Sequence, residues 1–326
     1  MNAALAPSAD AAAPPVRSGA GADRAFELIT VAAAWLVLLL LGATAVSMAW
    51  GGRLAFQTFG WRFITSTDWD AAGGHFGALV PIYGTLVTSA IALIIAVPVS
   101  IGIALFLTDI APRWTRGPIA IAIELLAAIP SIIYGMWGLF VFAPFMAAHV
   151  EPWLSEHLGN AAILGPLFSG PPIGIGMLTA GIVLGIMVIP FIASVAREVF
   201  NAVPAPLRES AVALGATRWE ILSRVTLPYT RSAIIGAVFL GLGRALGETM
   251  AVTFVLGNAH DLSASLLMPS NSIAAAIANE FTEADTDLYR SSLIALAFLL
   301  FVVTLIVLSI AKLLLLRMNR QFGRTH

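Results

Sequence analysis

The sequence contains no cysteine and a single lysine, Lys312. Without cysteine the chain can form no disulfide, no thiolate metal site and no redox dithiol. A phosphate-cradling GxxxxGK[ST] loop is also absent, so the chain does not carry the nucleotide site of a P-loop ATPase. Charged residues make up only 11% of the chain, against about 25% in a soluble domain. These absences exclude thiol chemistry and P-loop ATP hydrolysis, and they indicate that much of the chain is not in water.

Histidine is scarce as well, and it shows no metal-ligand spacing such as HExxH. The five histidines are His75, His149, His157, His260 and His326. The net charge is -1, so overall charge indicates no nucleic-acid partner. We therefore predict no metal site, no catalytic residues and no cofactor bound by this chain.

Long hydrophobic runs are what the sequence has instead, with 59% hydrophobic residues. A membrane-spanning helix needs about 20 apolar residues. Six runs meet that length: 26–49, 81–107, 118–146, 173–195, 232–257 and 291–316. Pro98 and Pro130 fall inside spans two and three, where neighbouring helices can satisfy the freed carbonyls. The predicted fold class is an all-α integral membrane protein with six transmembrane helices.

Positive charge is distributed unequally between the segments that join these spans. With the N-terminus inside, the inner segments hold Arg17, Arg24, Arg113, Arg116, Arg197, Arg208, Arg218, Arg224, Arg231, Lys312, Arg317, Arg320 and Arg324. The outer loops hold Arg53, Arg62 and Arg290, and they are rich in Asp and Glu. Because Lys and Arg favour the cytoplasmic side, we predict that both termini are inside, N-in and C-in.

The two ends of the chain are predicted to be cytoplasmic tails around one membrane domain. Residues 1–24 are rich in Ala and Pro, with little to bury, and we predict a disordered tail. A cleaved signal peptide is disfavoured, because the apolar run that follows is longer than a signal core of roughly 7–15 residues. The membrane domain would cover residues 25–320, and residues 321–326 would form the C-terminal tail.

The segment between spans four and five, residues 197–231, is too polar to cross a membrane. Gly215 suits the end of one short helix, where a left-handed residue is needed. Thr217 and Glu220 form a capping box for a second short helix that would end before Pro228. We predict a helical hairpin that docks onto a cytoplasmic partner. An amphipathic helix on the membrane surface is the alternative.

The hairpin sequence ESAVALGATRWEILSRVTLP, residues 209–228, resembles the EAA motif of importer-type ATP-binding-cassette permeases. Ser210 and Val225 replace the Ala and Ile of that motif. The resemblance implies a coupling helix that docks in a groove of a separate ATPase subunit, which would bind ATP and Mg. The ATPase-coupling residues would be Glu209, Ser210, Ala211, Gly215, Leu227 and Pro228.

Three other stretches resemble the C-type permease subunits of phosphate-specific transport systems: residues 76–112, 124–144 and 241–258. The resemblance implies an ATP-driven phosphate importer with alternating access in the bacterial inner (plasma) membrane. It also implies four partner proteins: an A-type permease homologous to this chain, two cytoplasmic ATP-binding subunits and a periplasmic phosphate-binding protein. A permease for another oxyanion, such as phosphonate, is the alternative.

Arg244 and Glu248 place two charges inside predicted span five. A charge near mid-membrane costs at least about 2.5–3.5 kcal/mol, so the two need partners or a wet cavity. Four residues apart, they would share one helix face and form an ion pair. We predict that Arg244 binds phosphate in the pathway and that Glu248 neutralises Arg244 when the site is empty. The alternative is an ion pair that only locks two permeases together.

Two residues of span three are weaker pathway candidates. Glu124 could act in gating or pair with an inner arginine such as Arg116. Tyr134 could hydrogen-bond in the pathway or be a core aromatic residue. A break at Pro130 would either present a half-helix end to the anion or be a packing kink.

Two other classes of function remain open from the sequence. A secondary transporter or channel would need no ATPase, although such transporters usually contain repeated halves, and no clear repeat is present here. A membrane-embedded sensor or scaffold is the other class. The outer segment 272–281 could contact the binding protein or lie flat on the membrane.

Overall fold

The computed structural model describes residues 20–162 and 164–322, in two compact units that divide between Ser47 and Met48. Most of the two predicted tails, residues 1–19 and 323–326, lies outside the described residues. Residues 20–24 are not tail but the start of helix α1 (Ala20–Gly51). Asp23 lies in the first turn of α1, where a negative charge favours the helix. The apolar part of α1, Asp23–Gly51, is long enough to cross a membrane.

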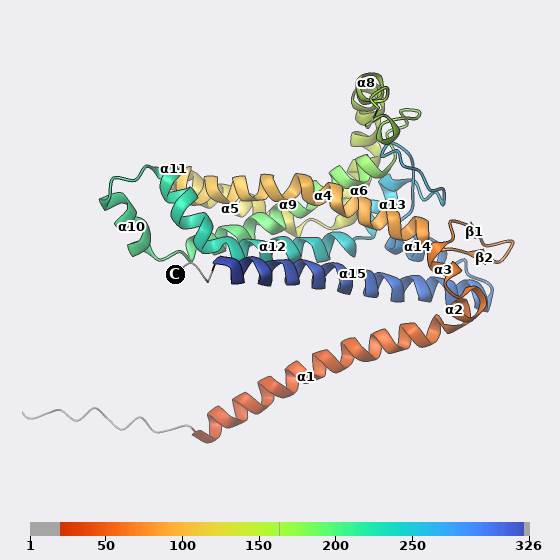
Figure 1. Ribbon diagram of the computed structural model, residues 1–326, viewed down its shortest axis with the longest axis horizontal. Helices are drawn as coiled ribbons and strands as arrows, with labels where there is room; N and C mark the ends of the chain where they lie inside the picture. The colour runs from red at the N-terminus through yellow and green to blue at the C-terminus, as the bar shows by residue number, and fades with distance from the viewer. Residues whose placement is uncertain (1–19, 163, 323–326) are drawn as a thin grey trace, which may run out of the picture. The chain divides into compact units, whose positions relative to one another are not determined.

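Helices make up most of the second unit (Figure 1). They are α2 (Arg53–Phe59), α3 (Arg62–Thr65), α4 (Leu79–Leu105), α5 (Arg113–Ala128), α6 (Ser131–Trp137), α7 (Ala143–Phe145), α8 (Glu151–Leu158), α9 (Met177–Asn201), α10 (Ala205–Ala213), α11 (Arg218–Ile221), α12 (Leu227–Leu246), α13 (Met250–Leu256), α14 (Ile273–Glu280) and α15 (Asp287–Phe322). Two short antiparallel strands, β1 (Trp69–Asp70) and β2 (His75–Phe76), form a hairpin before α4.

Six helical stretches are long and apolar enough to cross a membrane, so the predicted six-span, all-α fold class is confirmed. They are Asp23–Gly51, Leu79–Ile110, Ser131–Leu158, Met177–Asn201, Arg218–Leu246 and Asp287–Arg317. The predicted spans one, two, four and six overlap closely with these stretches. Spans three and five differ from the prediction.

The predicted third span, 118–146, is wrong in its bounds. The backbone is extended at Ile129 and Pro130, with ψ angles of 129° and 137°, and this separates α5 from α6. The predicted break at Pro130 is therefore present. Proline has no N–H and restricts the residue before it, so one helix cannot continue through 118–146. The spanning stretch is Ser131–Leu158, in which π-helical turns join α6, α7 and α8.

The predicted fifth span, 232–257, is also interrupted. Helix α12 ends at Leu246, and α13 begins only at Met250. Gly247 is a poor helix former. The Glu248 carboxylate accepts a hydrogen bond from the Ala251 N–H at 3.3 Å and holds the start of α13.

The hairpin helix α11 continues into α12, contrary to the prediction that it ends before Pro228. A π-helical turn, Leu222–Thr226, joins the two helices. Pro228 lies in the first turn of α12, where a missing N–H is tolerated. The stretch from Arg218 to Leu246 is therefore helical throughout.

Helix α9 is the centre of the second unit. It packs against α4, α5, α6, α12 and α13, and 61% of its apolar stretch is buried. Val183, Leu184, Val188 and Ile192 are fully buried on it. In Figure 1, α10 and α11 lie at one end of this bundle, and β1, β2 and α14 lie at the other. The end with α10 and α11 and the end with β1, β2 and α14 thus lie on opposite sides of the core around α9 (Figure 1).

The contact between α9 and α12 depends on Gly241. A Cβ added at Gly241 would lie 2.6 Å from Ile192 Cδ1, whereas the nearest atom to a Cβ at Gly243 is 3.9 Å away. We expect Gly241→Ala to lower the free energy of unfolding by about 1–3 kcal/mol through overpacking. Gly243→Ala is the matched control and should be neutral or stabilising by up to about 1 kcal/mol, because Ala favours a helix. Denaturant titration in detergent micelles measures both, and equal changes would contradict the close packing.

Candidate functional site

Arg244 lies in the last turn of α12 with its side chain exposed on the surface of the chain. Its guanidinium carbon is 5.8 Å from the centroid of the Phe191 ring on α9, within cation–π range. Gly247, three residues after Arg244, is also exposed. An exposed arginine in an apolar span must face protein or water, since lipid would not accept the charge.

The predicted ion pair between Arg244 and Glu248 is not formed. Within residues 20–162 and 164–322, no salt bridge joins Arg244 to a carboxylate. The physical reason is the break at Gly247, which ends the helical period that would have placed both side chains on one face. Glu248 instead holds the Ala251 N–H. Arg244 is therefore not neutralised by Glu248 in this structure.

Tyr134 lies on α6, directly after the break at Pro130. The hydroxyl donates a hydrogen bond to the Leu126 carbonyl at 2.9 Å. That carbonyl belongs to the last turn of α5 and also accepts a hydrogen bond from the Ile129 N–H at 3.3 Å. Tyr134 thus bridges the break at Pro130.

Glu124 pairs with Arg197 of α9 and not with Arg116, the example named from the sequence. Arg197 Nη2 lies 2.9 Å from Glu124 Oε1 and 3.0 Å from Glu198 Oε1. Arg116 instead donates from Nε to the Ala111 carbonyl at 2.8 Å. Sequence proximity favoured Arg116, but α5 packs along α9, and this packing brings Arg197 to Glu124.

The turn between α10 and α11 has the local structure that was predicted. Gly215 has φ +82°, and Thr217 and Glu220 make both hydrogen bonds of a capping box. Helix α10 has no buried residue, and Leu214 is 89% exposed. Of the predicted coupling residues, Glu209, Ser210, Gly215 and Pro228 are exposed, whereas Ala211 and Leu227 are half-buried. The hairpin therefore presents an apolar surface that this chain leaves uncovered.

Arg208 anchors the hairpin to the bundle, and the sequence analysis missed this role. Its Nη1 lies 3.2 Å from Asp109 Oδ1 in the π-helical turn after α4. Its Nη2 donates to the Phe200 carbonyl near the end of α9 at 2.7 Å. A movement of α10 is thus linked to two core helices. The sequence shows Arg208 next to Glu209 of the motif, but it does not show that Asp109 is the partner of Arg208.

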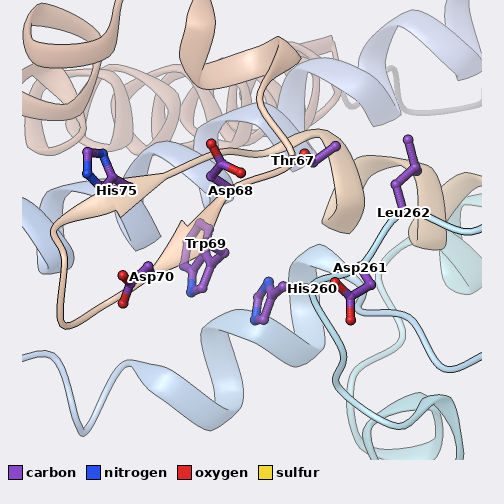
Figure 2. A pocket seen from close by; sticks show the side chains of 8 residues that line it. All are labelled: Thr67, Asp68, Trp69, Asp70, His75, His260, Asp261 and Leu262. Atoms are coloured by element: carbon purple, nitrogen blue, oxygen red, sulfur yellow. The ribbon is translucent and has the colours of Figure 1, made fainter.

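At the opposite end, a pocket of about 470 Å³ opens beside the β-hairpin (Figure 2). We call it the β-hairpin pocket, and it is lined by Thr67, Asp68, Trp69, Asp70, His75, His260, Asp261 and Leu262. Trp69 and His260 stack face to face there, with ring centroids 5.2 Å apart. Three carboxylates make this end acidic. Among the described residues, no group of three His, Asp or Glu side chains is placed to hold a metal ion.

Glu280 ties the segments around this pocket together. Its carboxylate accepts hydrogen bonds from Trp69 Nε1 at 2.6 Å and the Tyr289 hydroxyl at 2.7 Å, and it lies 3.0 Å from His260 Nε2. Segment 272–281, with Glu280 near its end, forms α14, which packs against α4 and α15 with Ile273 fully buried. The segment is thus part of the folded core of this end.

Burial acts to raise the pKa of Glu280, but hydrogen bonds from His260, Tyr289 and Trp69 outweigh it, so the pKa lies below its usual value. A lowered carboxyl pKa stabilises the fold above the unfolded pKa, about 4.3, and this stabilisation is lost as pH falls through the folded pKa. We expect Glu280→Gln to reduce the free energy of unfolding by about 1.5–3 kcal/mol at neutral pH.

The difference between the parent protein and Glu280→Gln should shrink as the pH falls below the usual carboxyl range. Denaturant titrations in detergent at several pH values measure this. Glu283→Gln is the matched control, because Glu283 lies three residues after Glu280 and is exposed. A difference that grows on acidification would contradict the assigned direction.

The chain is similar in sequence to a family of known membrane proteins. A family model described as "Binding-protein-dependent transport system inner membrane component" matches residues 96–320. The chain is 60% identical over 304 residues to "Phosphate transport system permease protein PstC" of Xylella fastidiosa strain Temecula1, covering 93% of this chain and 94% of the relative. It is 54% identical over 308 residues to the protein of the same name from Mesorhizobium japonicum, covering 94% of each chain.

Solved structures provide a comparison of the fold. The chain is similar to one in the crystal structure of a bacterial ABC transporter involved in the import of the acidic polysaccharide alginate. The TM-score is 0.54 with 19% sequence identity, covering 90% of this chain and 99% of the other. At that identity the similarity concerns the fold alone.

Proposed function

The chain belongs to the family of binding-protein-dependent transport system inner membrane components, and we propose that it is the transmembrane permease subunit of an ATP-driven inorganic phosphate importer. The observation that carries this function is its 60% identity, over 93% of its length, to a phosphate transport system permease protein. The family and the six spans make it a multi-pass protein of the bacterial inner membrane.

The hairpin end is the cytoplasmic side in this proposal, with both termini inside. The bias of Lys and Arg toward the segments at this end supports the orientation. Two cytoplasmic ATP-binding subunits serve the complex, and one docks on α10 and α11, where Leu214 and Trp219 are exposed by 89% and 71%. The acidic β-hairpin pocket then faces the periplasm, where a phosphate-binding protein docks.

A second, homologous A-type permease covers the exposed side of α5 and α6. Helix α5 has no buried residue in this chain, although it is largely apolar. Arg244 is an exposed charge within the span Arg218–Leu246, and lipid alone would not accept it. Phosphate passes between the two permeases, with Arg244 and Tyr134 lining the path on this side.

Two links carry movement from the ATPase to the anion path. One is the helical stretch from Arg218 to Leu246, which runs from the hairpin directly to Arg244. The other is Arg208, which ties α10 to Asp109 and to the end of α9. ATP binding and hydrolysis on the partner subunits, with Mg, would drive alternating access through these links.

Arg244 is the phosphate contact in this proposal. Its guanidinium offers a planar fork of donors suited to phosphate oxygens, and no carboxylate of the described residues occupies it. Glu248 acts by holding the start of α13 and so shaping the break beside Arg244. This role replaces the exchange of Glu248 for phosphate that the helical period predicts.

The experiment that tests the function is reconstitution of this chain with an A-type permease, the ATPase and the phosphate-binding protein in liposomes. Phosphate-loaded binding protein should stimulate the ATPase and drive phosphate accumulation. An ATPase that ignores phosphate-loaded binding protein would contradict the proposal. Stimulation by phosphonate-loaded binding protein alone would assign the permease to that oxyanion instead.

A further inference from the structure

Arg197 is the arginine of α9, and the sequence alone does not connect it to transport. Its Nη2 donates to Glu124 Oε1 at 2.9 Å and to Glu198 Oε1 at 3.0 Å. The Arg197 side chain is 20% exposed, whereas the two carboxylate side chains are 54% and 69% exposed. A mostly buried cation is therefore held by two carboxylates that remain accessible from outside the chain.

This cluster lies on the hairpin side of Arg244. The ring of Phe191 contacts the Arg244 guanidinium, and Glu198 follows Phe191 by seven residues on α9. Seven residues return to the same helix face about 10 Å further along the axis. An anion that leaves Arg244 along this face toward the hairpin would next meet the cluster around Arg197.

Helix α5 packs along α9 and contributes Glu124 to the cluster around Arg197. Pro112 precedes the helix and the break at Ile129–Pro130 follows it. None of its residues is buried. Two polar contacts join α5 to α9 and α6. Glu124 pairs with Arg197 of α9, and the Leu126 carbonyl accepts a hydrogen bond from the Tyr134 hydroxyl of α6. Exchange of Glu124 would therefore remove the ion pair that ties the middle of α5 to Arg197 of α9.

We infer that Arg197 is the inner gate residue of the phosphate path: Glu124 occupies it in the closed state, and phosphate displaces Glu124 as the path opens to the cytoplasm. The inference rests on the proposed function. A guanidinium binds carboxylate and phosphate oxygens with the same planar fork of donors. Because the carboxylates of this pair are largely exposed, their contacts with Arg197 are weakened by solvent and can be exchanged.

Glu198 has a separate part in this exchange. It lies beside Arg197 on the same helix and remains next to the guanidinium when Glu124 leaves. Its negative charge limits how tightly phosphate is held, so the anion is released and not trapped. A structural clamp between α5 and α9 would have no such consequence, because Arg197 would never contact the anion.

The test uses the assembled complex with Arg197→Gln, Arg197→Lys and Glu124→Gln, and with Glu156→Gln as a matched exposed control at the other end of the chain. The first readout is phenylglyoxal modification of Arg197, followed by peptide mass spectrometry without ATP. Inorganic phosphate should slow the modification in the parent, whereas chloride at equal ionic strength should not. Glu124→Gln should increase both the rate of modification and the protection by phosphate.

The second readout is phosphate uptake per assembled complex. Arg197→Gln should lower it about tenfold or more, and Arg197→Lys should recover part of the loss. Absence of phosphate protection, or equal losses in Arg197→Gln and Glu124→Gln with unchanged labelling, would overturn the inference in favour of a clamp. A parent complex that takes up no phosphate would instead overturn the proposed function. The two failures can be distinguished, because protection of Arg197 by phosphate is measured without transport.

Discussion

Replacing Arg244 with glutamine is expected to lower the rate of phosphate uptake by about 100-fold or more while leaving the complex assembled. Loss of one donor to a bound oxyanion typically costs about 100–1,000-fold. Arg244 has no carboxylate partner among the described residues, so its removal leaves no buried charge unpaired. The measurement is initial uptake of labelled phosphate into liposomes, normalised to the amount of assembled complex.

Two control variants make this result specific. Arg244→Lys keeps the charge but loses the planar fork, and it should give an intermediate rate. Arg53 has a comparable environment away from the path, with its guanidinium carbon 4.4 Å from the Trp50 ring. Arg53→Gln should therefore leave uptake unchanged. Normal uptake by Arg244→Gln in a normally assembled complex would rule out a pathway role for Arg244.

Leu214→Asp is expected to lower ATP-driven uptake strongly by weakening the docking of the ATPase. Leu214 is 89% exposed next to the left-handed Gly215, and it borders a hollow of about 350 Å³ on the hairpin. A carboxylate placed in an apolar contact should cost about 2 kcal/mol or more of binding free energy, which is about 30-fold in affinity. Co-purification of the ATPase with the permease pair measures this loss.

Leu262→Asp is the matched control, because Leu262 is also exposed, by 49%, but lies at the β-hairpin pocket. It should leave ATPase binding unchanged. Retention of the ATPase by Leu214→Asp, or equal losses in both variants, would show that the hairpin is not the docking surface. Because Leu214 makes no buried contact within the chain, the folded permease should be unaffected.

Local signals in the sequence predicted local structure well. The capping box at Thr217 and Glu220, the left-handed Gly215 and the break at Pro130 depend on residues within a few positions of one another. Six long apolar runs were sufficient to predict six spans. In each case the determining chemistry lies in one stretch of chain.

Tertiary partners were not predictable in the same way. The pair of Arg197 with Glu124 joins residues 73 positions apart, and it depends on how α5 packs on α9. The assumption of one continuous helix failed at Gly247, and the predicted partner of Arg244 was lost with it. The Glu280 carboxylate contacts Trp69, His260 and Tyr289, which lie in three separate segments. No periodicity in the sequence relates these segments to one another.

The π-helical turn at Leu222–Thr226 fixes the angular phase between the docking hairpin and Arg244. A π-helical turn contains one residue more than regular α winding, and one residue corresponds to about 100° of rotation. Rewinding this turn would therefore rotate the guanidinium around the axis of α12 with little change in the length of the helix. If an ATPase docks on the hairpin as proposed, a small change in winding at this turn would change the direction that Arg244 faces.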